Sequence, residues 1–258
     1  MKSILAIVVP WYNPDQIATF RDAWQVEKDD QRIMFVEDKK RDGCSTTKNR
    51  GISAAINAGA EVVIVLDDDC LPHNGMTLDA FIEAHIRALE PQLVISCVAV
   101  TSPPSRGTPY LNQHIKMDVA ASLGFWSGVP DWDAPAQLVR GKHATMDFHR
   151  RAIFGQYFPF CGMNFAFRRN QWPWCQLIKV DRFDDIWMGW LWERYAYAAG
   201  YCFNLNGPMV SHSRQSNVWK NLIAEAPNLE RNDHLWHDIA TSPLLEHADM
   251  LDRHKLTI

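Results

Sequence analysis

The chain has 258 residues and a formal net charge of −4, with 47% hydrophobic and 22% charged residues. This composition argues against bulk disorder, and the charge argues against a strong sequence-independent nucleic-acid binder. The apolar run Ile4–Val9 is too short for a membrane-spanning helix or a signal peptide, and no later run approaches the length of a span. The six cysteines include no CxxC pair, so we expect reduced thiols in a cytoplasmic protein without membrane insertion.

The first hundred residues alternate short apolar runs with segments that favour helix. This alternation is typical of an α/β fold with a mostly parallel sheet whose two faces are covered by helices, and whose functional groups lie at the carboxyl ends of the strands. The predicted strands are Ile4–Val9, Ile33–Val36, Val62–Leu66 and Leu93–Val100. The predicted helices are Thr46–Ala58, closed by Gly59, and Thr77–Leu89, begun by Thr77.

The second half is less regular. Long loops with a helix near His114–Leu123 are predicted between Thr101 and Ala152. A second helix is predicted at Asp184–Ala199, ended by Gly200 and followed by a strand, Tyr201–Leu205. The polar tail, Leu222–Ile258, is expected to pack as peripheral helices.

Three consecutive carboxylates, Asp67, Asp68 and Asp69, follow the strand Val62–Leu66. Like charges at the end of a buried strand repel one another unless a cation balances them. Mg²⁺ and Mn²⁺ prefer such oxygen ligands and share them with substrate phosphates. Because side chains alternate in an extended segment, Asp67 and Asp69 are predicted to point the same way. The plain alternative is an acidic loop that caps the next helix.

Other polar residues are predicted at the same edge of the sheet. Lys48 and Arg50 open the helix before the acidic strand, where a helix N-terminus favours phosphate, although a solvated basic face has the same composition. The first two strands end in residues that suit a nucleobase, through aromatic stacking and a carboxylate that accepts from a base N–H. These residues are Pro10, Tyr12, Glu37 and Asp38.

The order of these motifs resembles the nucleotide-sugar-binding half of glycosyltransferases with the GT-A fold, a Rossmann-like α/β fold. Segments of the second half resemble the plant reversibly glycosylated polypeptides, a family that includes the UDP-arabinopyranose mutases. The resemblance runs from about Ile4 to Trp236. Its motifs are Gly124–Trp126, Val129–Gln137, Phe160–Phe167, Arg182–Trp190 and Ser211–Ser213.

The resemblance implies one GT-A-like domain over residues 1–258. Residues 1–100 would form the nucleotide-binding half, residues 101–221 the sugar and acceptor half with an acceptor-side loop and helix region, and residues 222–258 a peripheral C-terminal segment. It also implies a UDP-sugar as donor substrate and Mn²⁺ or Mg²⁺ as cofactor.

The resemblance assigns roles residue by residue. Asp67, Asp69 and His212 would hold the metal, and Asp67 and Asp68 would lie against the diphosphate. Asp184 and Asp185 would serve as base toward an acceptor hydroxyl. The residues that would line the sugar include Gly162 and Asn164. Without the resemblance, a surface histidine at position 212 and a helix cap at position 184 are the plainer interpretations.

One position departs from the plant mutases. There, an Arg-Gly-aromatic-Pro-aromatic segment is followed closely by an arginine that carries the sugar transiently. Here the segment is Arg106–Tyr110, and the position expected for that arginine holds Gln113. A glutamine cannot readily take that role. The departure therefore argues against mutase chemistry but not against a sugar-nucleotide site.

The leading hypothesis is a metal-dependent glycosyltransferase that moves a sugar from UDP-arabinose or another UDP-pentose or UDP-hexose to an unidentified hydroxyl acceptor. Lys48, Arg50 or Arg168 would add positive charge at the diphosphate. Trp132, Trp187 and Trp190 could face the sugar ring, with core packing as the alternative.

Three other functions stay open. One is mutase-like pyranose–furanose interconversion, and another is a non-catalytic UDP-sugar-binding subunit. The third is a phage-type transferase that glycosylates a DNA base such as hydroxymethylcytosine, with the basic residues between Arg140 and Arg151, Arg168 and Arg169 as its groove. The acceptor could thus be a sugar, a protein or a modified base. A homo-oligomer is also open.

Overall fold

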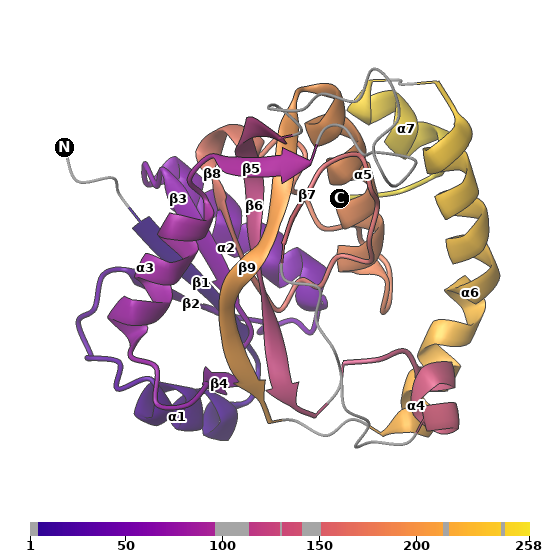
Figure 1. Ribbon diagram of the computed structural model, residues 1–258. Helices are drawn as coiled ribbons and strands as arrows, with labels where there is room; N and C mark the ends of the chain where they lie inside the picture. Colours follow the sequence, from indigo (N-terminus) through magenta and orange to yellow (C-terminus); the bar gives the residue numbers. More distant parts are fainter. Residues whose placement is uncertain (1–4, 96–113, 130, 141–150, 214–216, 244–245) are drawn as a thin grey trace.

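The computed structural model describes residues 5–95, 114–129, 131–140, 151–213, 217–243 and 246–258. In these residues a nine-stranded sheet carries the strands in the order β2-β1-β3-β8-β6-β9-β4, while β5 pairs with β6 and β7 pairs with β9 outside this path (Figure 1). The strands are β1 (Leu5–Trp11), β2 (Ile33–Glu37), β3 (Val62–Leu66), β4 (Cys70–Pro72), β5 (Gln92–Ile95), β6 (His114–Gly128), β7 (Ala152–Ile153), β8 (Asn164–Arg168) and β9 (Tyr201–His212).

Seven α-helices accompany the sheet in the described part of the chain. They are α1 (Pro14–Ala23), α2 (Cys44–Asn57), α3 (Leu78–Ala88), α4 (Ala134–Arg140), α5 (Asp184–Ala198), α6 (Val218–Thr241) and α7 (His247–Arg253). The predicted helix signals are confirmed at three ends. The Thr77 hydroxyl accepts from the Ala80 amide at the start of α3. Gly59 and Gly200 take positive φ, 95° and 82°, just after α2 and α5.

The sheet is mixed, and the expected parallel arrangement holds only for its first part. β1 is parallel to both β2 and β3, as the alternation of strands and helices predicts. β8 is antiparallel to β3 and β6, and β9 is parallel to β6 but antiparallel to β4 and β7. The expectation of a mostly parallel sheet is therefore wrong for the second half of the chain.

The predicted helix near His114–Leu123 is also wrong, because this segment is the first part of the long strand β6. Ala120 and Ala121 favour helix by propensity, but the segment pairs with β5, β8 and β9 at once. Such pairing overrides local preference. The predicted strand Leu93–Val100 is β5, which ends at Ile95 within the described residues and runs antiparallel to β6.

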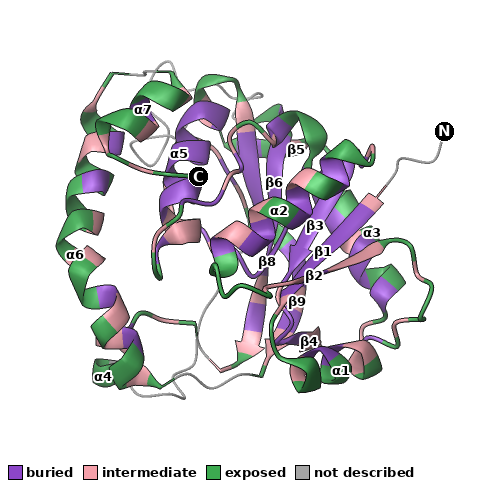
Figure 2. Cartoon of the chain, turned by 180° about the vertical axis from the view of Figure 1, so that it is seen from behind, coloured by how far each residue is buried: buried purple, intermediate pink, exposed green. Residues whose placement is uncertain are grey.

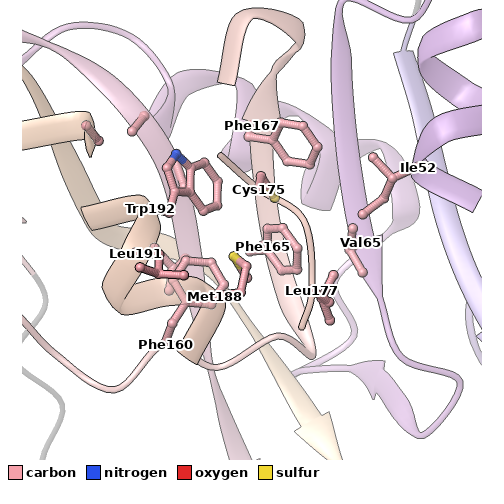
Figure 3. Packing of buried hydrophobic residues seen from close by; sticks show 14 of the residues in the cluster. Ile52, Val65, Phe160, Phe165, Phe167, Cys175, Leu177, Met188, Leu191 and Trp192 are labelled. Carbon is pink, nitrogen blue, oxygen red and sulfur yellow. The ribbon is translucent and has the colours of Figure 1, made fainter. Parts of the chain in front are cut away.

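Two layers of helices cover the sheet because side chains alternate along its strands. Val63 and Val65 of β3 face a core shared with α2 and α5, whereas Ile64 and Leu66 face α1 and α3. Figure 3 shows the first core, in which the rings of Phe165 and Phe167 lie between Ile52 of α2 and Trp192 of α5. Both faces of β3 are thus buried, which explains its unbroken apolar sequence.

Helix α5 is buried over most of its length (Figure 2). Every residue from Trp187 to Ala196 is buried. Trp187 and Trp190 belong to the core, so packing is the better explanation of these tryptophans. The tail forms α6 and α7 at the periphery, as expected (Figure 1). No helix in the described residues combines the length and hydropathy that a membrane crossing requires.

Candidate functional site

The predicted site residues gather mainly at one edge of the sheet. Leu66, the last residue of β3, pairs with Asn164, the first residue of β8. His212, the last residue of β9, pairs with Cys70 on one side and with Gly128, the last residue of β6, on the other. The acidic triplet between β3 and β4 therefore lies at the edge where β6 and β9 end and where β8 begins.

Asp69 and His212 come together across this edge, although 143 positions separate them. The Asp69 Oδ2 atom lies 3.5 Å from His212 Nε2; the Asp69 side chain is buried and that of His212 is partly buried. His212 Nδ1 lies 2.8 Å from the backbone carbonyl of Val129, to which it donates. Burial opposes protonation of His212, but its hydrogen bond with Asp69 and the charge of Asp69 raise its pKa overall.

Asp69 and His212 could supply two ligands to a divalent cation. A metal-binding histidine usually donates from one ring nitrogen to a carbonyl or carboxylate, which turns the lone pair of the other nitrogen toward the metal. The bond from Nδ1 to Val129 leaves His212 Nε2 facing the Asp69 carboxylate in this way. In the described residues, no group of three or more His, Cys, Asp or Glu side chains could hold a metal ion. A cation bound by Asp69 and His212 would take its remaining ligands from water or substrate.

Asp67 is held differently, by a buried lysine. The Lys48 ammonium lies 2.7 Å from Asp67 Oδ1 and donates to the backbone carbonyl of Gly162 at 2.8 Å. Burial opposes the charge on Lys48, but the Asp67 carboxylate nearby raises its pKa well above the ordinary value. The sequence predicts that Lys48 binds phosphate; in the structure its ammonium is engaged by Asp67 and Gly162.

Asp184 and Asp185 form the first turn of α5, beside Gly162. Asp185 Oδ2 accepts from the Gly162 amide at 2.6 Å, and its other oxygen accepts from the Ile186 amide at 2.9 Å. Burial raises the pKa of both carboxyls, and the charge of Asp184 raises that of Asp185 further. Carboxyls of this kind exchange protons closer to neutral pH than an exposed aspartate does.

The expected nucleobase residues lie at the ends of β1 and β2. The guanidinium of Arg41 lies over the Tyr12 ring, 4.4 Å from its centroid. The two carboxylate oxygens of Asp38 accept hydrogen bonds from the backbone amides of Asp42 and Gly43. The Arg50 guanidinium donates to the backbone carbonyl of Glu37. Tyr12 is exposed, with Arg41 over its ring, while Asp38 shapes the turn before α2.

Several predicted residues lie elsewhere or point elsewhere. Pro10 is buried within β1, opposite Val36. Asp68 is buried, and its carbonyl accepts from Gln16. Asn164 is fully buried, and its side chain bonds to His85 and to the carbonyl of Pro208 rather than lining an open site.

Arg168 cannot supply charge at the diphosphate, which corrects the sequence-based expectation. It pairs with Val62 at the start of β3, whereas Asp67 follows the end of that strand. The five residues of β3 separate these two ends by about 13 Å. Arg169, next to it, contacts Glu61 and the carbonyl of Ile56 at the same far edge.

Two groups that contribute to the site are not predicted from the sequence. The carbonyl of Val129 orients His212, but a backbone atom leaves no sequence signal. Asp131 lies beside the site, with its carboxylate 3.7 Å from Cys161 Sγ and close enough to raise the pKa of Asp185. Asp131 belongs to the family-like motif Val129–Gln137, and this motif is the sequence signal that points to it.

Gln113 and the basic residues 142, 143, 149 and 150 lie outside the described residues.

The fold and this edge define an α/β protein with a polar site at the ends of its sheet strands. A family model described as "Reversibly glycosylated polypeptide" matches residues 56–237, and the chain belongs to that family. This membership confirms the resemblance of the second-half motifs to the reversibly glycosylated polypeptides.

Curated relatives are similar at moderate identity. "Probable UDP-arabinopyranose mutase 1" of Pisum sativum is 29% identical over 188 residues, which cover 63% of this chain and 50% of that protein. "UDP-arabinopyranose mutase 1" of Arabidopsis thaliana is 28% identical over 188 residues, with 63% and 51% covered. A Solanum tuberosum protein, "Probable UDP-arabinopyranose mutase 1", is 32% identical over 131 residues, with 46% and 35% covered. The chain thus spans about half the length of the curated relatives it matches.

Proposed function

We propose that this chain is a glycosyltransferase that binds a UDP-sugar, with Mn²⁺ or Mg²⁺, at the edge formed by β3, β6 and β9. The observation that carries the proposal is the Asp69–His212 pair, with His212 fixed by Val129 so that Nε2 faces the carboxylate. A bound cation would neutralise charge on the departing diphosphate. Family membership supports a sugar-nucleotide substrate.

The acceptor side of the proposed site is the Asp184–Asp185 pair. In the transfer, the bond between the anomeric carbon and the diphosphate oxygen breaks with its electron pair on UDP. The acceptor oxygen bonds to the anomeric carbon, and its proton passes to a carboxylate of the pair. The raised pKa of both carboxyls supports this role, because a base works best when its pKa lies near the working pH.

Calorimetry with UDP and Mn²⁺ tests the donor site. We expect Asp69→Ala to weaken metal-dependent UDP binding at least about tenfold, since losing even an indirect partner of a metal ligand costs about 10- to 100-fold in affinity. Asp233→Ala, which removes an exposed carboxylate on α6, is the matched control and should bind as the wild type does. Undiminished metal-dependent binding by Asp69→Ala would rule out the metal assignment.

A second candidate is ring-form interconversion of a UDP-pentose, favoured by the names of the curated relatives. It uses the same donor site but needs no external acceptor. Incubation with UDP-arabinopyranose and Mn²⁺ alone, followed by chromatography of the products, separates the two. Appearance of the furanose form supports the mutase, while hydrolysis or an unchanged substrate supports the transferase. We expect the second result because of Gln113.

A further inference from the structure

Lys48 stands between the two carboxylate groups of the site. It comes from the second turn of α2, and only 3% of its surface is exposed. Its ammonium contacts Asp67 Oδ1 at 2.7 Å and the Gly162 carbonyl at 2.8 Å. These two partners come from the end of β3 and from the loop before β8, so one side chain joins three separate segments.

Gly162 extends this link to the acceptor side. Its carbonyl accepts from Lys48, and its amide donates to Asp185 Oδ2 at 2.6 Å. The approach to Asp185 is close, because a Cβ added at Gly162 would lie only 2.7 Å from the Asp185 Cβ. A continuous chain of contacts therefore runs from Asp67 through Lys48 and Gly162 to Asp185.

We propose that Lys48 is a positioning residue that holds the donor-side carboxylate Asp67 and, through Gly162, the acceptor-side carboxylate Asp185 in one fixed arrangement. Its charge also balances Asp67 within the protein, which leaves Asp69 and His212 as the pair that meets a cation. Asp67 is partly buried, and such a carboxylate moves toward water or becomes protonated when it loses its cationic partner. The inference rests on the proposed function, but its first test needs no turnover.

The first test follows the carboxyls of Asp184 and Asp185 by ¹³C NMR during a pH titration without metal. Charged or titratable groups surround them: Lys48 and Cys44 on α2, Asp67 after β3, and Asp131 with Cys161 near α4. The Lys48 charge lowers the pKa of both carboxyls. In Lys48→Met we expect both to titrate at higher pH than in the wild type. Lys48→Arg keeps the charge and should restore the wild-type titration.

The second test measures UDP binding with Mn²⁺ by calorimetry. We expect Lys48→Met to weaken binding about tenfold or more and Lys48→Arg to recover most of the loss, because the arginine keeps a cation beside Asp67. Lys28→Met, which removes an exposed lysine between α1 and β2, is the matched control and should change neither result.

The outcomes separate the two proposals. If the wild type fails to bind UDP, the proposed function fails, and the NMR titration still decides the role of Lys48. If Lys48→Met folds, and its Asp184 and Asp185 carboxyls titrate and it binds UDP as the wild type does, then Lys48 is not a positioning residue. Should Lys48→Met fail to fold, Lys48→Arg decides instead: wild-type titration and binding support the inference, and a stable Lys48→Arg variant with displaced titrations overturns it.

Discussion

Asn164 illustrates how a residue in a family-like motif can serve the structure rather than the substrate. Its side-chain amide donates to the Pro208 carbonyl, so its oxygen faces His85 Nε2 at 2.9 Å. His85 must therefore donate from Nε2, which leaves Nδ1 to accept from the Ser122 hydroxyl at 2.9 Å. The network joins α3, β6, β8 and β9, and it requires a neutral imidazole.

This network predicts a pH-dependent stability. Burial lowers the pKa of His85 to about 4, while in the unfolded chain it is about 6.5. As pH falls below about 6.5, the unfolded state gains a proton that the folded state does not, so the free energy of unfolding falls. Between about pH 7.5 and about pH 5 the loss should reach about 2 kcal/mol.

Urea unfolding of wild type and His85→Gln at both pH values measures this contribution. Glutamine does not titrate, so the difference in stability between the two pH values should change by about 2 kcal/mol in the variant. Comparing the two proteins cancels the carboxyl groups that also titrate in this range. Equal pH dependence in both proteins would show that His85 does not supply this effect.

At the scale of elements, the approach of α5 to the site loop depends on Gly189. This glycine lies in the middle of a buried helix, where alanine would normally be the better residue. An added Cβ would overlap the Cβ of Phe160, an atom that no side-chain rotation can move away. Phe160 in turn begins the motif that carries Gly162, so the close approach helps to set Asp185 against the Gly162 amide.

We therefore expect Gly189→Ala to lower the free energy of unfolding by about 3 kcal/mol despite the better helix propensity. Denaturant unfolding measures the loss. Gly155→Ala is a useful control, because Gly155 has a positive φ of 71° but open space around its Cβ position. That change should cost only about 1 kcal/mol. A neutral or stabilising Gly189→Ala would show that the loop moves aside without difficulty.

At the scale of the whole molecule, a mixed sheet with helices on both faces brings distant segments to one edge. Asp69 and His212 meet there because β4, which directly follows Asp69, pairs with the end of β9. Lys48 meets Gly162 because α2 packs on the same face as α5. The site is thus assembled from both halves of the chain, and neither half holds all of its polar groups.

The predicted features that were confirmed depend on neighbours in sequence. Apolar runs such as Val62–Leu66, the N-cap Thr77 and the glycines after α2 and α5 encode their structures locally. The family-like motifs are equally local, and the family model bears them out. The ordered motifs also place Asp69 and His212 in one predicted site.

Other features were decided only by tertiary structure. β6 is a strand because three other strands pair with it, although part of its sequence favours helix. Lys48 contacts Asp67 and Gly162, and the Asn164 side chain hydrogen-bonds within the core. Arg168 lies at the far edge of the sheet, opposite Val62. Each of these positions depends on contacts with residues distant in sequence. Local sequence patterns suffice to predict the family, the first strands and helices, and the residue types available for chemistry. Where each side chain points depended on burial and strand pairing, because these long-range contacts outweigh local preference.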